Sequence, residues 1–273
     1  MAHGTPNNHL SPEDVHAYWT KEAIRHGLSP SASWSDHPVI ELEIQAIGPR
    51  VAHARTLDVG CANGYSSIAF ATGHGAQVLG IDYVEEMVTS ALQRREALPD
   101  ELQARVEFRL GDARSLDLED ATFERVVSTR VMINLSGWEE QRLALGECLR
   151  VLRPGGLLLL SEATVGGWSR LNALRTEWGL DAIPMPAFNL YLDESKVIDL
   201  LLPDAELVAL EDFASSYYVA TRFLKPILAR GGQAQSAVDV ADPHSEFNRW
   251  ASSLPPAGDY GTQKLFVFAK RAT

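Results

Sequence analysis

The chain of 273 residues is 45% hydrophobic and 22% charged, an ordinary globular composition that can support a large buried core. Its formal net charge of −12 argues against nucleic acid or an anionic membrane as a partner, because both reward clustered Lys and Arg. The chain has only two cysteines, no signal-like N-terminus and no apolar run long enough to span a membrane, so it is predicted to be cytoplasmic, without disulfides or a zinc site.

The first part of the chain is predicted to contain two helices. Ser11-Pro12-Glu13-Asp14 is a typical helix start, with Ser as the cap, Pro in the first turn and acids near the positive end of the helix dipole. Gly27 is a natural stop, and a second helix is expected after Asp36. Because both helices precede the alternating part of the chain, residues 1–53 are predicted to form a helical appendage.

From residue 55 the pattern alternates between strands and helices, as a parallel α/β sheet requires. Strands are predicted at residues 55–59, 77–81, 105–110, 123–128, 157–161, 206–213 and 264–269. Helices are predicted at 64–73, from 84 onward, from 136 onward and at 193–201. Ser136 and Glu139 have the spacing of a capping box, and Arg-Pro-Gly-Gly at 153–156 indicates a sharp break before the fifth strand.

Two stretches interrupt this alternation within a domain that we predict to span residues 54–273. Residues 164–192 contain Gly, Pro, Trp and Asn without long periodicity, with a short helix expected near 171–178. Residues 216–258 are predicted to contain a helix near 217–229, a flexible stretch at 231–235 and then polar, Pro-rich chain. We interpret both stretches as insertions near the functional edge of the sheet.

The most informative segment covers residues 58–64, where a buried strand ends in a tight loop with glycines at 60 and 64 before a helix begins. Glycine has no Cβ and tolerates positive φ, so a ligand can come close to the main chain there. The following helix offers unpaired N–H groups. The segment therefore predicts a nucleotide-like ligand at the carboxyl end of the first strand.

The spacing of this loop does not fit the nicotinamide-binding fingerprint, which has glycines at the first, third and sixth positions. Counting from Gly60, the third residue is Ala62 and the sixth is Tyr65. The pattern acid-x-Gly-x-Ala-x-Gly instead resembles motif I of the class I S-adenosylmethionine-dependent methyltransferases, with Ala62 at a position that is usually glycine.

Four further matches follow in the order of that family. They are Asp82 after the second strand, Gly-Asp-Ala at 111–113 after the third, Ser-Thr-Arg at 128–130 after the fourth, and Leu-Arg-Pro-Gly-Gly at 152–156 before the fifth. The resemblance covers roughly residues 55–163. It implies an α/β fold with a Rossmann-like, seven-stranded, mostly parallel sheet, helices on both faces and an antiparallel last strand.

The resemblance also implies S-adenosylmethionine as cofactor and S-adenosylhomocysteine as product. Asp82 would take both ribose hydroxyls, Asp112 would lie at the adenine, and the glycine loop would hold the amino-acid end. The predicted cofactor contacts are Asp58, Gly60, Cys61, Asn63, Gly64, Asp82, Tyr83, Met87, Gly111, Asp112, Ala113, Thr129 and Arg130.

The acceptor is less well defined by the sequence. Segments 189–192, 245–249 and 258–260 resemble a subgroup that methylates small molecules in natural-product or surface-saccharide pathways. Residues 1–53 and the two insertions are rich in aromatic residues and are predicted to form a lid around a small molecule. The predicted acceptor contacts are Tyr18, Trp34, Asn134, Asn189, Tyr191, Tyr217, Tyr218, Arg222 and Glu246.

No motif identifies a general base, which is needed only if the acceptor keeps its proton near neutral pH. The main candidates are His37, Glu162 and Tyr191, and no metal is expected. The resemblance thus implies in-line methyl transfer to an O or N atom of a small molecule. A nicotinamide-dependent oxidoreductase and a non-catalytic, cofactor-binding partner subunit stay open as alternatives, and so does a homodimer.

Overall fold

The computed structural model describes residues 10–230 and 242–272. The stretch 231–235, which the sequence predicts to be flexible, lies outside the described residues. In the described part of the chain, no helix is both long and apolar enough to cross a membrane.

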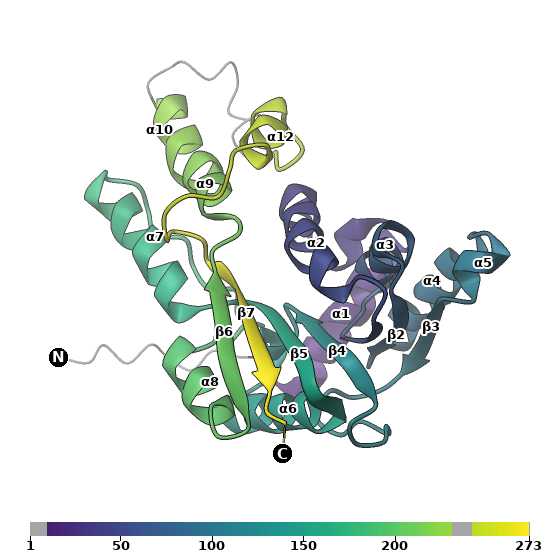
Figure 1. Ribbon diagram of the computed structural model, residues 1–273. Coiled ribbons are helices and arrows are strands. Elements are labelled where there is room, and N and C mark those ends of the chain that lie inside the picture. Colours follow the sequence, from purple (N-terminus) through teal and green to yellow (C-terminus); the bar gives the residue numbers. More distant parts are fainter. Residues whose placement is uncertain (1–9, 231–241, 273) are drawn as a thin grey trace.

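A seven-stranded sheet with the order β3-β2-β1-β4-β5-β7-β6 forms the centre of the molecule (Figure 1). Its strands are β1 (Arg55–Val59), β2 (Gln77–Asp82), β3 (Val106–Leu110), β4 (Phe123–Thr129), β5 (Leu152–Ala163), β6 (Ala205–Glu211) and β7 (Gln263–Lys270). β7 runs antiparallel to both of its neighbours, and the other pairings are parallel. This confirms the predicted Rossmann-like sheet with an antiparallel last strand.

Helices cover both faces of the sheet, and alternate residues of the central strands face opposite cores. Val127 of β4 and Leu159 of β5 pack in one core with α2 (His37–Val51), α3 (Tyr65–His74) and α4 (Glu85–Glu96). Val126 and Leu158 pack in the other core with α6 (Trp138–Val151) and α8 (Glu194–Leu201). This two-sided burial explains the continuous hydrophobic run at residues 157–160 of β5 and the adjacent valines at 126 and 127 of β4.

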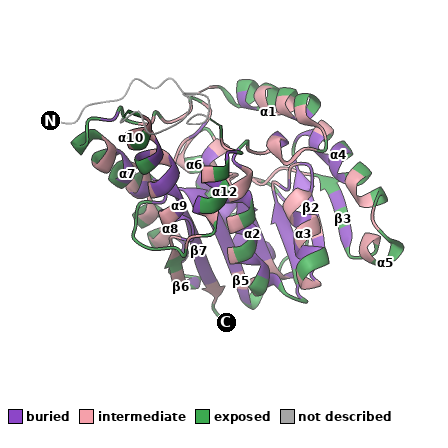
Figure 2. Ribbon diagram, turned by 90° about the horizontal axis from the view of Figure 1, so that it is seen from above, coloured by how far each residue is buried: buried purple, intermediate pink, exposed green. Residues whose placement is uncertain are grey.

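The N-terminal region forms the two expected helices. Ser11 caps α1 (Pro12–His26) by accepting a hydrogen bond from the Asp14 N–H at 3.2 Å, and Gly27 ends the helix with φ of 51°. A 3-10 turn, η1 (Pro30–Ala32), leads to α2. α1 packs against α4 and η1 at the rim of the sheet, where one side of it is largely exposed (Figure 2).

Two local predictions around α6 were wrong in detail. The N-cap of α6 is Gly137, and it is Glu140, not Glu139, that accepts hydrogen bonds from the N–H and hydroxyl of Ser136, at 3.0 and 2.9 Å. The 153–156 segment does not precede β5 but lies within it. The β4–β5 register shifts between Phe123 and Arg125, so this glycine-containing segment forms an irregularity in the strand.

The first insertion contains a longer helix than expected. α7 (Val165–Glu177) begins where the Thr164 hydroxyl accepts a hydrogen bond from the Gly167 N–H at 3.1 Å, whereas the sequence predicted a helix only near 171–178.

The second insertion contains α9 (Ser215–Tyr218), a π-helical turn η3 (Val219–Leu224), α10 (Lys225–Arg230) and α12 (Glu246–Ser252). Together with α7 these elements project beyond the carboxyl end of β6 (Figure 1). The remaining short elements are α5 (Asp100–Gln103) and η2 (Met132–Asn134).

Candidate functional site

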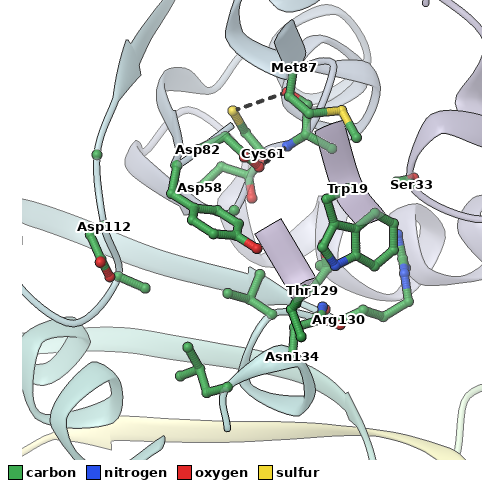
Figure 3. Close-up of a pocket in the computed structure, with 18 of the residues that line it drawn as sticks. Trp19, Ser33, Asp58, Cys61, Asp82, Met87, Asp112, Thr129, Arg130 and Asn134 are labelled. Carbon is green, nitrogen blue, oxygen red and sulfur yellow. Dashed lines mark hydrogen bonds between the residues drawn. The ribbon is translucent and has the colours of Figure 1, made fainter. Parts of the chain in front are cut away.

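A pocket opens at the carboxyl ends of β1 to β4, where the strand order reverses between β1 and β4. Such a switch point is the usual ligand crevice of an open α/β sheet. Residues of α1 and of the segment between η1 and α2 also line it, including Val15, Trp19 and Ser33. In Figure 3, Asp112 lies on the opposite side of the pocket from Trp19, Thr129, Arg130 and Asn134.

The structure brings the predicted cofactor residues together at this pocket. All of them line it except Gly64, which lies behind the loop as the N-cap of α3. Of the predicted acceptor contacts, only Asn134 lines it.

The glycine loop has a conformation that its sequence makes accessible. Gly60 and Gly64 have φ of 71° and 75°, and Ala62 also lies in the left-handed region at 47°. A Cβ on Gly60 would meet Val131 Cγ2 at 2.2 Å, and one on Gly64 would meet Phe108 Cζ at 2.6 Å. Both glycines are therefore required by backbone conformation and by neighbouring side chains.

Asp82 ends β2 and faces the glycine loop. Its two carboxylate oxygens accept hydrogen bonds from the N–H groups of Ala62 and Val84, each at 2.9 Å. Burial raises its pKa to about 6, although these N–H groups oppose the shift. The carboxylate is thus held rigidly at the pocket wall, with lone pairs left for a ligand.

Asp58, at the end of β1, is 1% exposed and only half satisfied. The Ser67 hydroxyl donates to Oδ2 at 2.5 Å, whereas Oδ1 is buried and has no hydrogen-bond partner among the described residues. Burial raises the pKa of this carboxyl to about 7. A buried acceptor without a donor is costly, so this oxygen is suited to a ligand cation.

Asp112 lies after β3 and is held by its neighbour in the chain. The Arg114 guanidinium donates to both oxygens, from Nε to Oδ1 at 3.0 Å and from Nη2 to Oδ2 at 2.6 Å. Arg114 also pairs with Glu140 at 2.7 Å, and this guanidinium holds the pKa of Asp112 below its usual range. The nearby Tyr83 ring meets His16 edge-on at 5.1 Å.

Arg130, directly after β4, has a left-handed backbone with φ of 59°. Its guanidinium pairs with Glu43 of α2 and lies over the Trp34 ring, 5.2 Å from the centroid. Gln263 of β7 donates to the other oxygen of Glu43 at 2.5 Å. This buried network ties α2 to the sheet, and it accounts for Trp34, which supports Arg130 instead of lining the pocket.

The loop after β4 is fixed by Glu162, one of the predicted base candidates. Its fully buried carboxylate accepts from the N–H groups of Val131 and Met132 at 2.9 and 3.1 Å and from the Ser128 hydroxyl at 3.0 Å. Burial raises its pKa to about 7. Glu162 does not line the pocket, so its role in this structure is to hold the loop.

Asn134 lies in the same loop and points into the pocket. Its Nδ2 donates to the Arg130 carbonyl at 2.6 Å, and its Oδ1 is buried without a partner in the described part of the chain. It therefore offers a fixed hydrogen-bond acceptor at the side of the pocket where Thr129 and Arg130 lie (Figure 3).

Several predicted acceptor contacts instead hold the second insertion against α2. The Tyr217 hydroxyl donates to Asp36 at 2.6 Å and accepts from Asn248 at 3.0 Å. Arg222 pairs with the same Asp36 and lies over the rings of Tyr217 and Tyr218. These contacts lie outside the pocket and join η3 and α12 to the start of α2.

The other candidates are more dispersed. Tyr18 stacks on Phe188 at 4.4 Å, and Tyr191 meets Trp168 edge-on at 6.4 Å. His37 bonds to the Ser31 hydroxyl at 2.8 Å and faces His244 at 4.5 Å. Glu246 is 95% exposed on α12, and Asn189 is buried in the first insertion. None of these five predicted residues (Tyr18, Tyr191, His37, Glu246 and Asn189) is among the lining residues of the pocket.

The sequence did not predict the other residues that line the pocket, which are Pro12, Val15, Trp19, Ser33, Ala62, Tyr65, Ser66, Arg114, Val131, Leu135, Ser136 and Glu140. The predicted α1 contained a usable signal, because Val15 and Trp19 are four residues apart and so share a helix face. Nothing local indicates that this face would cover the pocket. Within the described ranges, no group of three or more metal-ligating side chains occurs.

The comparisons with known proteins agree with this geometry. Residues 56–156 match the family model described as a methyltransferase domain. This segment is a class I S-adenosylmethionine-dependent methyltransferase domain, as the sequence motifs predicted, and S-adenosylmethionine is the methyl donor of that class.

Three curated relatives match parts of the chain. A probable S-adenosylmethionine-dependent methyltransferase of Mycolicibacterium smegmatis is 34% identical over 52% of this chain and 50% of its own length. A demethylmenaquinone methyltransferase of Renibacterium salmoninarum is 31% identical over 56% and 63%, and the 27-O-demethylrifamycin SV methyltransferase of Amycolatopsis mediterranei is 36% identical over 42% and 40%. The chain thus spans less than two thirds of each of these proteins.

Solved structures share the fold over most of the chain. The magnesium protoporphyrin IX methyltransferase from Synechocystis, with bound S-adenosylhomocysteine, has a TM-score of 0.59 at 14% identity, covering 95% of this chain and 100% of that one. The [4+2]-cyclase SpnF has a TM-score of 0.57 at 22% identity, covering 85% and 81%. At these identities the likeness concerns the fold alone.

The pocket fits the chemistry of the donor of this class. An adenosyl group needs acceptors for ribose hydroxyls and for an exocyclic amine, and Asp82 and Asp112 stand at neighbouring strand ends. An amino-acid group brings an ammonium ion, and the unpaired Oδ1 of Asp58 is a matching acceptor.

Proposed function

We propose that this protein transfers a methyl group from S-adenosylmethionine to an O or N atom of a small-molecule acceptor. The observation that supports this most strongly is the convergence of the glycine loop, Asp82 and Asp112 on one pocket, within a segment that matches a methyltransferase domain. The same match favours methyl transfer over the nicotinamide and non-catalytic alternatives.

Within this proposal the ribose, the adenine and the ammonium group of the cofactor each have a named partner. Asp82 binds the ribose, Asp112 lies at the adenine with Arg114 holding its orientation, and Asp58 Oδ1 accepts from the ammonium group. The bound donor supplies an electrophilic methyl group on a sulfonium. The chain contributes orientation of the two reactants, which is worth about 7–11 kcal/mol when the geometry is good.

The acceptor side of the pocket offers positioning groups but no free base among its lining residues. Thr129, Arg130 and Asn134 lie there, and Arg130 is already paired with Glu43. The base candidates His37, Glu162 and Tyr191 do not line the pocket. We therefore propose that the acceptor presents its nucleophile in reactive form near neutral pH, as an aromatic amine or an ionised hydroxyl does.

The lid predicted from residues 1–53 and the two insertions is part of this proposal. α1 forms a roof through Val15 and Trp19, and Tyr18 of α1 stacks on Phe188 of the first insertion. The second insertion holds the start of α2 through Tyr217 and Asp36. A largely apolar roof excludes water, and an enclosed site suits a small molecule better than a polymer.

A role in small-molecule biosynthesis fits the acceptors for which two relatives are named, demethylmenaquinone and 27-O-demethylrifamycin SV. The cytoplasmic location and the homodimer are sequence-based inferences and stay predictions.

The test is methyl transfer itself. The protein is incubated with methyl-labelled S-adenosylmethionine and fractionated small-molecule extracts, and products are analysed by mass spectrometry. Label should enter a low-molecular-weight product with wild type and not with Asp82→Ala, while Asp199→Ala on the exposed side of α8 serves as a matched control. Label entering protein or nucleic acid would contradict the acceptor class, and binding without any transfer would favour the partner-subunit alternative.

A further inference from the structure

Trp19 carries a buried polar atom that the fold leaves without a partner. The indole packs with Ala62 of the glycine loop against a small cluster that contains Val84 and Met87. Its Nε1 is buried and has no hydrogen-bond acceptor among residues 10–230 and 242–272. An indole N–H can only donate, so burying it unpaired is unfavourable unless a ligand supplies the acceptor.

The ring itself is held firmly, so the direction of its N–H is not free to vary. Tyr18 and Phe188 both meet the Trp19 ring edge-on, with centroids at 5.1 and 5.8 Å. Figure 3 shows the indole beside the pocket with its nitrogen facing the side where Thr129 and Asn134 lie. The donor is therefore preorganised toward the pocket.

The cofactor proposed above brings a charged acceptor that the proposed contacts at Asp58, Asp82 and Asp112 cannot serve, because carboxylates do not donate hydrogen bonds. Its amino-acid end carries an ammonium, which suits Asp58 Oδ1, and a carboxylate, which needs N–H groups. Both arginines that line the pocket are already committed, Arg130 to Glu43 and Arg114 to Asp112 and Glu140. Trp19 Nε1 is a buried donor of the pocket lining that has no partner among the described residues, and its ring packs against the same small cluster as Ala62 of the glycine loop.

We propose that Trp19 donates a hydrogen bond from Nε1 to the α-carboxylate of S-adenosylmethionine, so that the α1 roof recognises the amino-acid end of the donor. This inference rests on the proposed function, because its ligand is the proposed donor. Asp58, at the end of a strand, then binds the ammonium of the amino-acid group, and Trp19 of α1 binds its carboxylate. The protein would discriminate against donors that lack the carboxylate.

The proposal is tested by calorimetric titration of S-adenosylmethionine and of decarboxylated S-adenosylmethionine, which keeps the sulfonium, the adenosyl group and the ammonium. Wild type and Trp19→Phe are compared, since Phe keeps an aromatic ring but removes the N–H. The variant should bind S-adenosylmethionine about tenfold more weakly, as expected for a hydrogen bond to a charged group. It should bind the decarboxylated compound as wild type does.

Two controls make the result specific. Trp250→Phe, at a 53% exposed site on α12, should leave both affinities unchanged. Ligand-free Trp19→Phe should still unfold in one cooperative transition, well above the temperature of the titration, so that a loss of affinity cannot be ascribed to unfolding. A further comparison needs no variant: wild type should bind S-adenosylmethionine at least about tenfold more tightly than the decarboxylated compound.

The contrary outcomes are distinct from one another. Equal losses for both compounds in Trp19→Phe would show that the ring holds another part of the donor, and unchanged affinity would show that the N–H takes no part; either result overturns the proposal. If wild type does not prefer the donor that carries a carboxylate, the proposal also fails. If wild type binds neither compound, the proposed function itself is wrong.

Discussion

The side-chain amide of Asn63 binds the carbonyl of Gly27, and it makes a second bond to the Ser29 carbonyl, each at 2.8 Å. Asn63 belongs to the glycine loop and is 1% exposed, whereas its acceptors lie in the turn between α1 and η1. Arg94 of α4 adds a bond from its guanidinium to the Leu28 carbonyl. The cofactor loop and the N-terminal helices are therefore joined directly, and the Asn63 amide, predicted to contact cofactor, is already engaged.

Replacing Asn63 with Ala should loosen the N-terminal helices. The change leaves two carbonyls without their donor, which costs about 1–3 kcal/mol. Hydrogen exchange should rise in peptides covering residues 11–32 and not in the strands, and the free energy of unfolding in urea should fall by that amount. Ser253→Ala, at an exposed site, is the control. Equal exchange in variant and wild type would contradict the joining role.

Much of the fold follows from local sequence signals. The strand β5 is buried on both faces, so Leu158 belongs to an unbroken run of leucines at 157–160 that can be recognised without tertiary information. The glycine loop is also locally encoded, because Gly60 and Gly64 need positive φ. Asp82 and Asp112 were predictable because they follow strands whose carboxyl ends meet at one edge.

The remaining features depend on contacts between distant segments. A glutamate on a helix is usually exposed to solvent, so the sequence does not indicate that Glu43 is buried. Its burial depends on the ion pair with Arg130, which lies far away in the sequence. Tyr217 was predicted to face an acceptor because aromatic residues suit pockets, but its hydroxyl is bound to Asp36. Trp19 was missed for the same reason, since the sequence of α1 does not encode which element it covers.

The free energy of unfolding of the ligand-free protein should depend on pH through the titration of its buried carboxyl groups. The pKa of Asp58 is raised to about 7 by burial, whereas an unfolded Asp titrates near about 3.9. Between these values the folded chain holds more protons than the unfolded chain, so this contribution to stability is present at acid pH and is lost as pH rises to about 7. Urea unfolding of wild type and Asp58→Asn should therefore diverge across this range, with the variant gaining relative stability as pH increases.

Cofactor affinity should follow the opposite trend with pH. A ligand ammonium binds the ionised form of Asp58, so affinity for S-adenosylmethionine should increase as pH rises through about 7. Asp58→Asn should remove most of this dependence. A pH profile that is identical in wild type and variant would show that Asp58 does not meet the ligand cation.

Glu43→Gln should destabilise the protein strongly, because it leaves Arg130 without its charge partner in a buried site. Glu43 is 1% exposed and the Arg130 side chain 12%. Breaking such a pair costs about 3–5 kcal/mol. Glu139→Gln, which breaks an exposed pair with Arg142, should change the free energy of unfolding by less than about 1 kcal/mol. Similar effects of the two changes would contradict the structural role of the Glu43–Arg130 pair.

Calorimetric titration with S-adenosylhomocysteine tests the central claim most directly, that the pocket at the ends of β1 to β4 binds the methyl donor. Wild type should bind this product, and Asp199→Ala should bind it equally well. Asp82→Ala should lose at least about a hundredfold in affinity, because two hydrogen bonds from ribose to a charged group are removed. Retained affinity in Asp82→Ala, or binding of a nicotinamide cofactor in its place by wild type, would contradict the claim.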